Sequence, residues 1–281
     1  MQQLHSIEEC LFWRKLQKGT VGFVPTMGAL HKGHLSLVKL SKHFCDNTLV
    51  SIFVNPLQFA PTEDFDSYPK TIEQDIKLLQ RGGADAVFLP TEDQMYKQFH
   101  NTSFFESALS FKLEGRSRPH FFKGVTTIVD KFFNIINPTH TVFGQKDAQQ
   151  LLIIKKMIKI KNYNITLIEG PTVREKSGLA LSSRNNCFSK EEKKTASNIY
   201  QGLLNVKNSL NCGENQARFL KQIFKNHIKK FPLLKIDYIS IACINTLDEI
   251  LGVVDKEVLV STAVFFKSVR LIDNFSYSPS T

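Results

Sequence analysis

The chain has 281 residues, of which 42% are hydrophobic and 22% charged, so it can bury a large core and is not a disordered segment. Its formal net charge is +10, yet the lysines occur as separated singles and pairs rather than as a basic stripe with aromatic residues, and no nucleic-acid partner is expected. The five scattered cysteines form no CxxC pair, and no apolar stretch approaches the ~20 residues that span a bilayer, so we expect a cytoplasmic protein with reduced thiols and no membrane anchor.

Strand-like and helix-like segments alternate along the first two-thirds of the chain. Strands are predicted for short apolar runs that end at a turn, namely 21–25, 49–54, 86–89, 142–143 and 165–168. Helices are predicted where apolar residues recur at helical spacing, namely 32–42, 71–81, 124–136 and 148–159. Repeated units of this kind predict an α/β fold, a Rossmann-like doubly wound parallel sheet with helices on both faces.

After about Arg184, two charged helical segments are followed by three strand candidates. These segments are 189–210, 215–230, 236–241, 258–264 and 268–272. Helices followed by strands predict a separate, smaller C-terminal α+β domain. We expect a first domain of residues 1–175 and a lid-like domain of residues 176–281, with a hinge at about 173–188.

The most informative segment is 25–34, which follows the first predicted strand and opens the first predicted helix. In a doubly wound sheet this turn lies at the carboxyl edge, where ligands bind and helix N–H groups attract phosphate. Gly28 and Gly33 allow a close approach of the backbone. His31 and His34 lie on the same side of the first turn and could donate to a phosphoryl group. The alternative is a helix cap with two surface histidines.

The turn from Gly144 to Asp147 again joins a predicted strand to a predicted helix. Lys146 offers a mobile positive charge for a polyphosphate, and Asp147 either caps the helix or accepts from a ribose hydroxyl. One of Gln149 and Gln150 could reach a small polar substrate. An ordinary capped turn is the alternative interpretation.

The loop 178–185 begins with glycine and carries Ser182, Ser183 and Arg184. Two hydroxyls and an arginine suit closure over a triphosphate. A linker between domains is the alternative, and both interpretations can hold because interdomain loops commonly carry sites.

The strand predicted over 49–54 runs, within the segment 51–59, into a polar turn with Asn55 and Gln58 at its end, and Tyr68 follows shortly. A simple strand stop at Asn-Pro is the alternative. Three acidic residues nearby could meet Mg²⁺ or be solvated surface groups, namely Asp64, Asp66 and Asp75.

Taken together and in this order, the segments resemble the pantothenate synthetase family of the HxGH nucleotidyltransferase superfamily. The resemblance runs nearly end to end, and the ordered set is far more specific than any one motif. Its segments are 25–34, 51–59, 68–71, 114–119, 143–150, 171–175, 178–185 and 270–274.

The resemblance implies an AMP-forming ligase of pantothenate biosynthesis, which joins pantoate to β-alanine. The pantoate carboxylate would attack the α-phosphate of Mg·ATP and release pyrophosphate, and the β-alanine amine would then attack the pantoyl adenylate and release AMP. ATP with Mg²⁺ is implied as a substrate, with no bound organic cofactor, and the family implies a homodimer.

The resemblance also implies roles for particular residues. Catalytic roles fall to His34, His31 and Lys146. The ATP-binding residues would be Met27, Gly28, Ala29, Leu30, His31, Lys32, Gly33, His34, Gly144, Gln145, Lys146, Asp147, Val173, Leu181, Ser182, Ser183 and Arg184. Pantoate and β-alanine would be held by Gln58, Gln150, Asn55 and Tyr68. No protein ligand is assigned to Mg²⁺.

The chain departs from the family pattern in four places. Phe121 occupies the position of a usual histidine, and His120 stands one residue earlier, where in an extended segment its side chain would face the opposite way. The other departures are Gln74 for an acidic residue, Lys97 for proline and Gln145 for glutamate. The HxGH and SSRN elements are intact, so activity is expected.

Two related functions fit less well. Another adenylyl-transferring enzyme of the superfamily would leave AMP on its product, and Gln58 and Gln150 at pantoate-like positions argue against it. A tRNA-charging fragment would need more chain after Arg184 for tRNA recognition.

Overall fold

The structure, a computed structural model, describes residues 1–59, 65, 68–69, 71–98, 105 and 107–279. The chain divides into two compact units. The first consists of Met1–Phe111, Ser117–Gln145 and Gln149–Pro171, and the second of Lys112–Arg116, Lys146–Ala148 and Thr172–Thr281. Two short segments of the first two-thirds of the chain are therefore packed with the C-terminal unit. The hinge expected at 173–188 stays a prediction.

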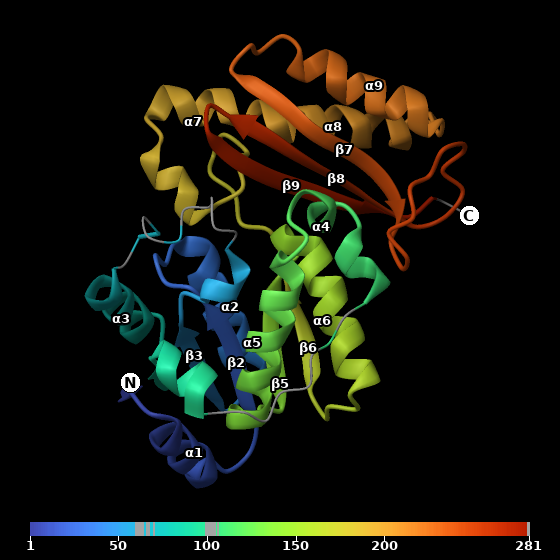
Figure 1. Cartoon of the computed structure of the whole chain (residues 1–281). Helices are drawn as coiled ribbons and strands as arrows, with labels where there is room; N and C mark the ends of the chain where they lie inside the picture. Colours follow the sequence, from blue (N-terminus) through green and yellow to red (C-terminus); the bar gives the residue numbers. More distant parts are fainter. Residues whose placement is uncertain (60–64, 66–67, 70, 99–104, 106, 280–281) are drawn as a thin grey trace. The chain divides into compact units, whose positions relative to one another are not determined.

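Over the described residues, the first unit contains a six-stranded sheet in the order β1-β4-β3-β2-β5-β6, and every paired neighbour runs parallel (Figure 1). The strands are β1 (Gln2–Leu4), β2 (Val21–Thr26), β3 (Asn47–Ile52), β4 (Ala86–Phe88), β5 (His140–Gly144) and β6 (Thr166–Gly170). The predicted Rossmann-like, doubly wound parallel sheet is confirmed.

Helices cover both faces of this sheet. The longer ones are α1 (Ile7–Leu16), α2 (Lys32–Phe44), α3 (Ile72–Arg81), α5 (Phe121–Ile136) and α6 (Ala148–Ile160). Successive residues of a strand point to opposite faces. On β2, Val24 packs in a core cluster with Val38 of α2 and Leu79 of α3. Its neighbour Phe23 faces the other way, with its ring 5.4 Å from that of Phe132 on α5.

Short helical turns complete the first two-thirds of the chain. They are η1 (Pro56–Gln58), η2 (Gln94–Gln98), η3 (Ala108–Phe111), α4 (Glu114–Ser117) and η4 (Gln145–Asp147). Of these, η1 and η4 follow the ends of strands β3 and β5, so they lie at the carboxyl edge of the sheet.

The strand order reverses between β2 and β5. From β2 the chain moves outward through β3 and β4, then returns to place β5 on the other side of β2. Gly22 pairs with His140 and Phe23 with Thr141, so Thr26 and Gly144 end two adjacent parallel strands. A reversal of this kind opens a crevice outside the strand ends. The turn after β2 and the beginning of the turn after β5 therefore share one edge.

The second unit is a small α+β fold, as predicted. Its strands β7 (Leu234–Cys243), β8 (Val258–Phe266) and β9 (Val269–Tyr277) form an antiparallel sheet in the order β7-β8-β9. Its helices are α7 (Lys190–Ala196), α8 (Asn198–Asn211) and α9 (Ala217–Ile228), with the turn η5 (Ser183–Cys187) before them. Leu203, Phe224 and Phe266 belong to the core cluster between helices and sheet.

The continuous helix expected over 189–210 is instead two helices, α7 and α8, divided at Ser197. The Ser197 hydroxyl donates to the carbonyl of Lys194, and the Asn198 amide donates to the carbonyls of Lys194 and Thr195. Side chains that bond nearby carbonyls in this way compete with the helical hydrogen bonds. The helical periodicity continues across the break, which is why the sequence pattern missed it.

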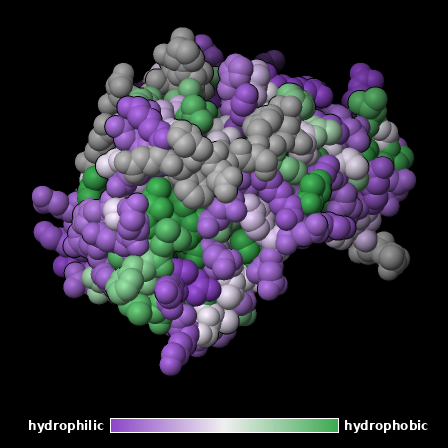
Figure 2. All heavy atoms as spheres, turned by 60° about the horizontal axis from the view of Figure 1, so that its bottom comes forward, coloured by the Kyte–Doolittle hydropathy of each residue, from purple (hydrophilic) through white to green (hydrophobic). Residues whose placement is uncertain are grey.

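The surface is of mixed hydropathy. Figure 2 shows a face on which hydrophilic side chains predominate, with hydrophobic patches between them. On α1, the exposed fractions of Leu11, Phe12 and Leu16 are 49%, 63% and 60%. Within the described part of the chain, no helix is both long enough and apolar enough to cross a membrane.

The cysteines differ sharply in environment, and this predicts their reactivity. All five are free; Cys10 and Cys45 are buried, Cys187 and Cys212 are exposed, and Cys243 is intermediate. Burial raises the pKa of the Cys10 thiol to about 12. Because the thiolate is the reactive species, we expect a thiol reagent to label the accessible Cys187, Cys212 and Cys243 in the folded protein and Cys10 only on unfolding. Peptide mapping of the labelled protein, with urea-unfolded protein as control, checks this order; early labelling of Cys10 would contradict it.

Candidate active site

The turn between β2 and α2 carries the two histidines of the HxGH segment. His31 caps α2, and its Nδ1 accepts from the Gly33 N–H at 3.1 Å. The Nδ1 of His34 accepts from the His31 N–H at 3.3 Å. The two rings are in contact and tilted, with their centroids 4.1 Å apart and an angle of 32° between their planes. A neutral imidazole carries one N–H group. Because Nδ1 accepts a hydrogen bond in each ring, the proton of the neutral ring is on Nε2, and each histidine can donate from Nε2–H.

A buried carboxylate holds the same turn from beneath. Asp75 on α3 is 1% exposed, and its two oxygens accept from the N–H groups of Ala29 at 2.9 Å and Leu30 at 2.8 Å. The Thr71 hydroxyl donates to the same carboxylate at 3.1 Å. The solvated surface position expected for Asp75 is therefore wrong. The N–H groups of Ala29 and Leu30 therefore both donate within the protein.

The backbone of the turn depends on this carboxylate. Gly28 has φ +84° and Ala29 has φ +50°, in the left-handed region that favours glycine. A Cβ on Gly28 would also meet a carboxylate oxygen of Asp75 at 3.1 Å. The left-handed conformation of Ala29 costs on the order of 1 kcal/mol, which its hydrogen bond to Asp75 offsets.

Asn55, one of the predicted pantoate residues, is buried and supports a neighbour. It is 1% exposed, and its amide nitrogen donates to Gln58 Oε1 at 2.9 Å and to the Gly124 carbonyl at 3.0 Å. Its oxygen accepts from the Leu57 N–H at 3.3 Å and from the Tyr96 hydroxyl. Because Oε1 of Gln58 is held, its Nε2 is oriented as a donor, which suits a carboxylate or hydroxyl.

Tyr96 contacts a predicted site residue, Asn55, and the sequence analysis did not identify it. Burial, with a smaller effect of Glu92, raises the pKa of its hydroxyl above the usual range, so it stays a hydrogen-bond donor to Asn55. The adjacent departure from the family pattern, Lys97, is exposed and pairs with Asp93 at 2.9 Å. Local periodicity could not indicate this contact of Tyr96, because Asn55, the residue to which it donates, lies 41 residues away in the chain.

The start of α5 is helical where the sequence analysis expected an extended segment. His120 has φ −89° and ψ −13° and is exposed at the N-cap of α5. A slip of one residue there turns a side chain by about 100°, not to the opposite face, so that expectation is wrong. Phe121 is half-buried, and the Arg118 guanidinium lies 3.9 Å from its ring centroid. Arg118 also donates to the Gln58 carbonyl at 3.1 Å, so Phe121 supports an arginine that holds the η1 turn.

Helix α5 and η1 touch through their backbones at Gly124. A Cβ there would meet the Leu57 carbonyl oxygen at 2.2 Å, so only glycine fits.

The two glutamines on α6 differ in environment. Gln149 is 4% exposed and donates to the Leu109 carbonyl at 2.7 Å. Gln150 is half-buried and is thus the better candidate for a substrate contact.

Tyr68 is buried in a small aromatic cluster. Its ring centroid lies 5.9 Å from that of Phe59, and the Phe59 centroid lies 5.3 Å from that of Phe65.

Two of the candidates for a Mg²⁺ contact, Asp64 and Asp66, lie outside the described residues. Among the residues that are described, no group of three or more His, Cys, Asp or Glu could hold a metal ion.

The second unit carries the remaining predicted nucleotide residues. A bridge between Arg174 and Ala180 closes a hairpin, and the Leu181 N–H donates to the Val173 carbonyl at 2.9 Å. Ser182 then caps η5, its hydroxyl accepting from the Arg184 N–H at 3.3 Å. Asp147 lies beside Lys146, with its carboxylate 3.5 Å from the Lys146 ammonium. Gly144 and the exposed Gln145 lie in the first unit, at the end of β5.

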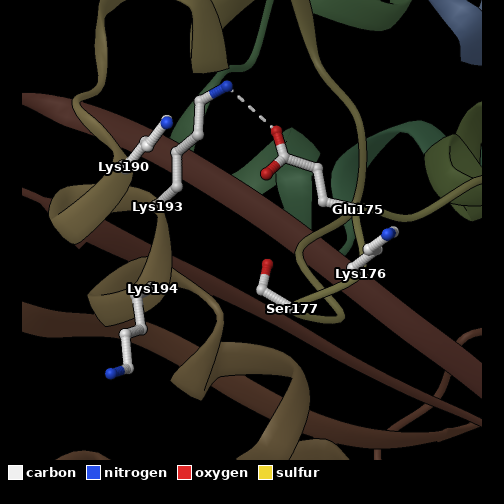
Figure 3. A pocket seen from close by; sticks show the side chains of 6 residues that line it. All are labelled: Glu175, Lys176, Ser177, Lys190, Lys193 and Lys194. Carbon is white, nitrogen blue, oxygen red and sulfur yellow. Dashed lines mark hydrogen bonds and ion pairs between the residues drawn. The ribbon is translucent and has the colours of Figure 1, made fainter.

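A basic hollow of about 450 Å³ borders this hairpin (Figure 3). It is lined by Glu175, Lys176, Ser177, Lys190, Lys193 and Lys194. The Lys193 ammonium points to the Glu175 carboxylate, at 3.0 Å, whereas Lys194 points away. Four lysines against one glutamate, with three of the lysines on α7, give the hollow a positive surface that attracts anions.

Comparison with known proteins decides the family. The family model described as pantoate-beta-alanine ligase matches residues 1–276. The chain belongs to the pantoate–β-alanine ligase family. It is 46% identical over 260 residues to the pantothenate synthetase of Thermosipho africanus, with 92% of each chain covered. The predicted family and the predicted class of enzyme, a ligase, are confirmed.

Solved structures agree with this pantoate–β-alanine ligase assignment. The pantothenate synthetase of Thermus thermophilus superposes with a TM-score of 0.90 at 36% identity, over 98% of this chain and 99% of that chain. The pantoate–β-alanine ligase of Francisella tularensis, solved with β-γ ATP and β-alanine, superposes with a TM-score of 0.79 at 33% identity over the whole of both chains.

Within each unit, hydrogen bonds gather several of the predicted site residues into small groups. The first unit brings together the His31–His34 pair and its Asp75 support, and separately the Asn55–Gln58 turn with Tyr96. The burial of Asp75, though not its hydrogen-bond partners, could have been found from the sequence. Ile72, Ile76 and Leu79 mark the apolar side of α3, and helical spacing places residue 75 on that side.

Replacing Asp75 with asparagine tests the support of the turn. Asparagine keeps the shape but turns one acceptor into an NH₂ group facing a backbone N–H, which leaves a buried donor without an acceptor. We expect the free energy of unfolding to fall by about 1–3 kcal/mol and the KM for ATP to rise. Urea unfolding and steady-state kinetics measure both. Glu73→Gln, at an exposed position on the same helix, is the matched control; an unchanged unfolding midpoint in Asp75→Asn would contradict the assignment.

Proposed function

We propose that this chain condenses pantoate with β-alanine to form pantothenate, with ATP as the energy source and AMP and pyrophosphate as products. Membership of the pantoate–β-alanine ligase family supports the reaction. The observation that supports the site is the parallel pairing of β2 with β5, which brings the histidine turn and the Gly144–Gln145 start of the Lys146 turn to the same edge of the sheet. The complex of the Francisella tularensis relative with β-γ ATP and β-alanine supports the ligands.

The histidines would act in the first step of the reaction. A carboxylate oxygen of pantoate attacks the α-phosphorus, the bond from that phosphorus to the α,β-bridging oxygen breaks, and pyrophosphate leaves with the electron pair. The Nε2–H groups of His31 and His34 donate to the phosphoryl oxygens, where negative charge builds. Mg²⁺ would enter as part of the nucleotide substrate, and Lys146 would add a positive charge to the polyphosphate.

The glutamines would act in positioning the acid. Gln58, its Oε1 held by Asn55, presents amide N–H groups to pantoate, and Gln150 supplies a second amide. In the second step the amine of β-alanine attacks the adenylate carbonyl, AMP leaves, and the amine loses a proton as the amide forms. Holding both reactants converts a bimolecular attack into an effectively intramolecular one.

The second unit carries its own residues that we propose contact ATP. The closed hairpin and the residues after it carry Val173, Leu181, Ser182, Ser183 and Arg184, and the basic hollow beside the hairpin favours anions.

We also propose a homodimer, as the family resemblance implies, and large hydrophobic side chains exposed on α1 offer a surface for it. Sedimentation measures the assembly state. The cytoplasmic location expected from the sequence stays a prediction.

Isotope exchange between pyrophosphate and ATP tests the substrate. Because adenylate formation precedes use of the amine, we expect exchange that requires pantoate and proceeds without β-alanine. Addition of β-alanine should then release AMP. Exchange of the same rate without pantoate would reject pantoate as the acid, and pyrophosphate release with AMP retained on the product would favour an adenylyl-transferring enzyme instead.

Replacing His34 with alanine tests the predicted donor. We expect turnover to fall by about 10²-fold or more, as when a preorganised transition-state donor is lost. The His31 N–H also loses its acceptor, so thermal unfolding should accompany the kinetics. His43→Ala, at an exposed position of the same helix, is the matched control. Turnover of His34→Ala near that of the parent would remove His34 from the mechanism.

A further inference from the structure

The segment 270–274 is part of the family pattern but has no role in the function described above. It lies on β9, at the edge of the C-terminal sheet. Two adjacent residues of this segment, Asp273 and Asn274, form hydrogen bonds to two segments that lie far from them in sequence. Each of those two segments carries predicted nucleotide-binding residues. Both segments belong to the same compact unit as β9.

Asp273 holds the hairpin that leads to Ser182. It is 4% exposed, and its two oxygens accept from the Arg174 guanidinium at 2.6 Å and 2.8 Å. The same guanidinium donates to the Gly178 carbonyl at 3.1 Å and lies 3.8 Å from the ring centroid of Tyr200. A bidentate, largely buried pair of this kind fixes orientation as well as position.

Asn274 holds the turn that carries Lys146. Its side-chain amide donates to the Lys146 carbonyl at 2.8 Å, across 128 residues of chain. Its backbone N–H donates to Asp273 Oδ1 at 2.8 Å, which joins the two contacts. Two adjacent residues of one strand therefore set the Lys146 turn and the Arg174 hairpin relative to each other.

We propose that Asp273 and Asn274 are positioning residues for the nucleotide. They hold the Lys146 turn and the hairpin that precedes Ser182 at the fixed separation that two such groups need in order to bind one polyphosphate. The antiparallel pairing of β9 with β8 makes the strand a rigid support. This inference rests on the proposed function, because it assigns Lys146 and Ser182 to ATP.

The test is a double-mutant cycle on pantoate-dependent pyrophosphate exchange with the full-length protein. Asn274→Ala removes the donor to Lys146, and Asn274→Asp removes it while keeping the shape of the side chain. We expect each to lower kcat/KM for ATP about tenfold or more, because small misplacements of a binding group are costly. The parent and Ser276→Ala, at an exposed position of β9, should match each other.

The Lys146→Ala background separates positioning from general stability. If Asn274 acts through the Lys146 side chain, the loss caused by Asn274→Ala should largely vanish once that side chain is gone. An equal factor in both backgrounds, or no loss in the parent background, would overturn the proposal. If Asn274→Ala does not fold, as judged by its thermal unfolding, the same comparison is made with the isosteric Asn274→Asp. Absence of exchange in the unmodified protein would instead reject the proposed function itself.

The Asp273 contact has its own variant. Asp273→Asn keeps the shape but removes the charge that holds Arg174, and we expect it to raise the KM for ATP severalfold while the KM for β-alanine stays about the same. Arg174→Lys, which keeps the charge but loses the bidentate geometry, should give the same pattern. A change confined to thermal stability, with all kinetic constants intact, would reduce this pair to a structural role and overturn that part of the proposal.

Discussion

Parallel pairing of β2 with β5 is the constraint on which the site of the first unit depends. Gly22 and Phe23 pair with His140 and Thr141, which lie more than a hundred residues further along the chain. Because both strands run in the same direction, their carboxyl ends meet at one edge, and the chain leaves each end through a turn. The His31–His34 turn and the Gly144–Gln145 end thereby share that edge through strand pairing alone.

Buried polar side chains then give these turns their shape. Asp75 accepts from two backbone N–H groups of the histidine turn. The Asn55 amide bonds the Gln58 turn on one side and the Gly124 carbonyl of α5 on the other. In the second unit Asp273 does the same for the Arg174 hairpin. Each of these residues is at most 4% exposed, so each must be paired with a partner, and removal of that partner is costly. The groups that we propose contact a ligand are thus oriented by buried groups that we do not assign to ligand binding.

The departures from the family pattern have local physical consequences. Phe121, in place of a histidine, provides a ring face for the Arg118 guanidinium, which in turn holds the backbone of Gln58. Gln145 and Lys97 are exposed, so their replacement changes surface charge rather than packing. Gln74 is likewise exposed on α3. The next residue, Asp75, is the carboxylate that bonds the histidine turn, and it is present in this chain.

Periodicity and turn chemistry were enough to predict from the sequence the α/β class, most strands and helices, and the change of character that separates the two units. Local patterns succeed there because the hydrophobic period directly reports which face of an element is buried. They missed β1 and α1, although Ser6 and Glu9 have the spacing of a helix cap, and Ser6 does accept from the Glu9 N–H.

Only the tertiary structure determined the contacts between residues that lie far apart in the chain. The acceptor for Ala29, the donor to Asn55 and the strand that holds Lys146 lie 46, 41 and 128 residues away from their partners. The helical start of α5, which places His120 on the surface, also depends on the packing of that helix against η1 at Gly124. The sequence determined the elements because each records its own burial, whereas the pairing of distant polar groups exists only once the strands and helices have packed.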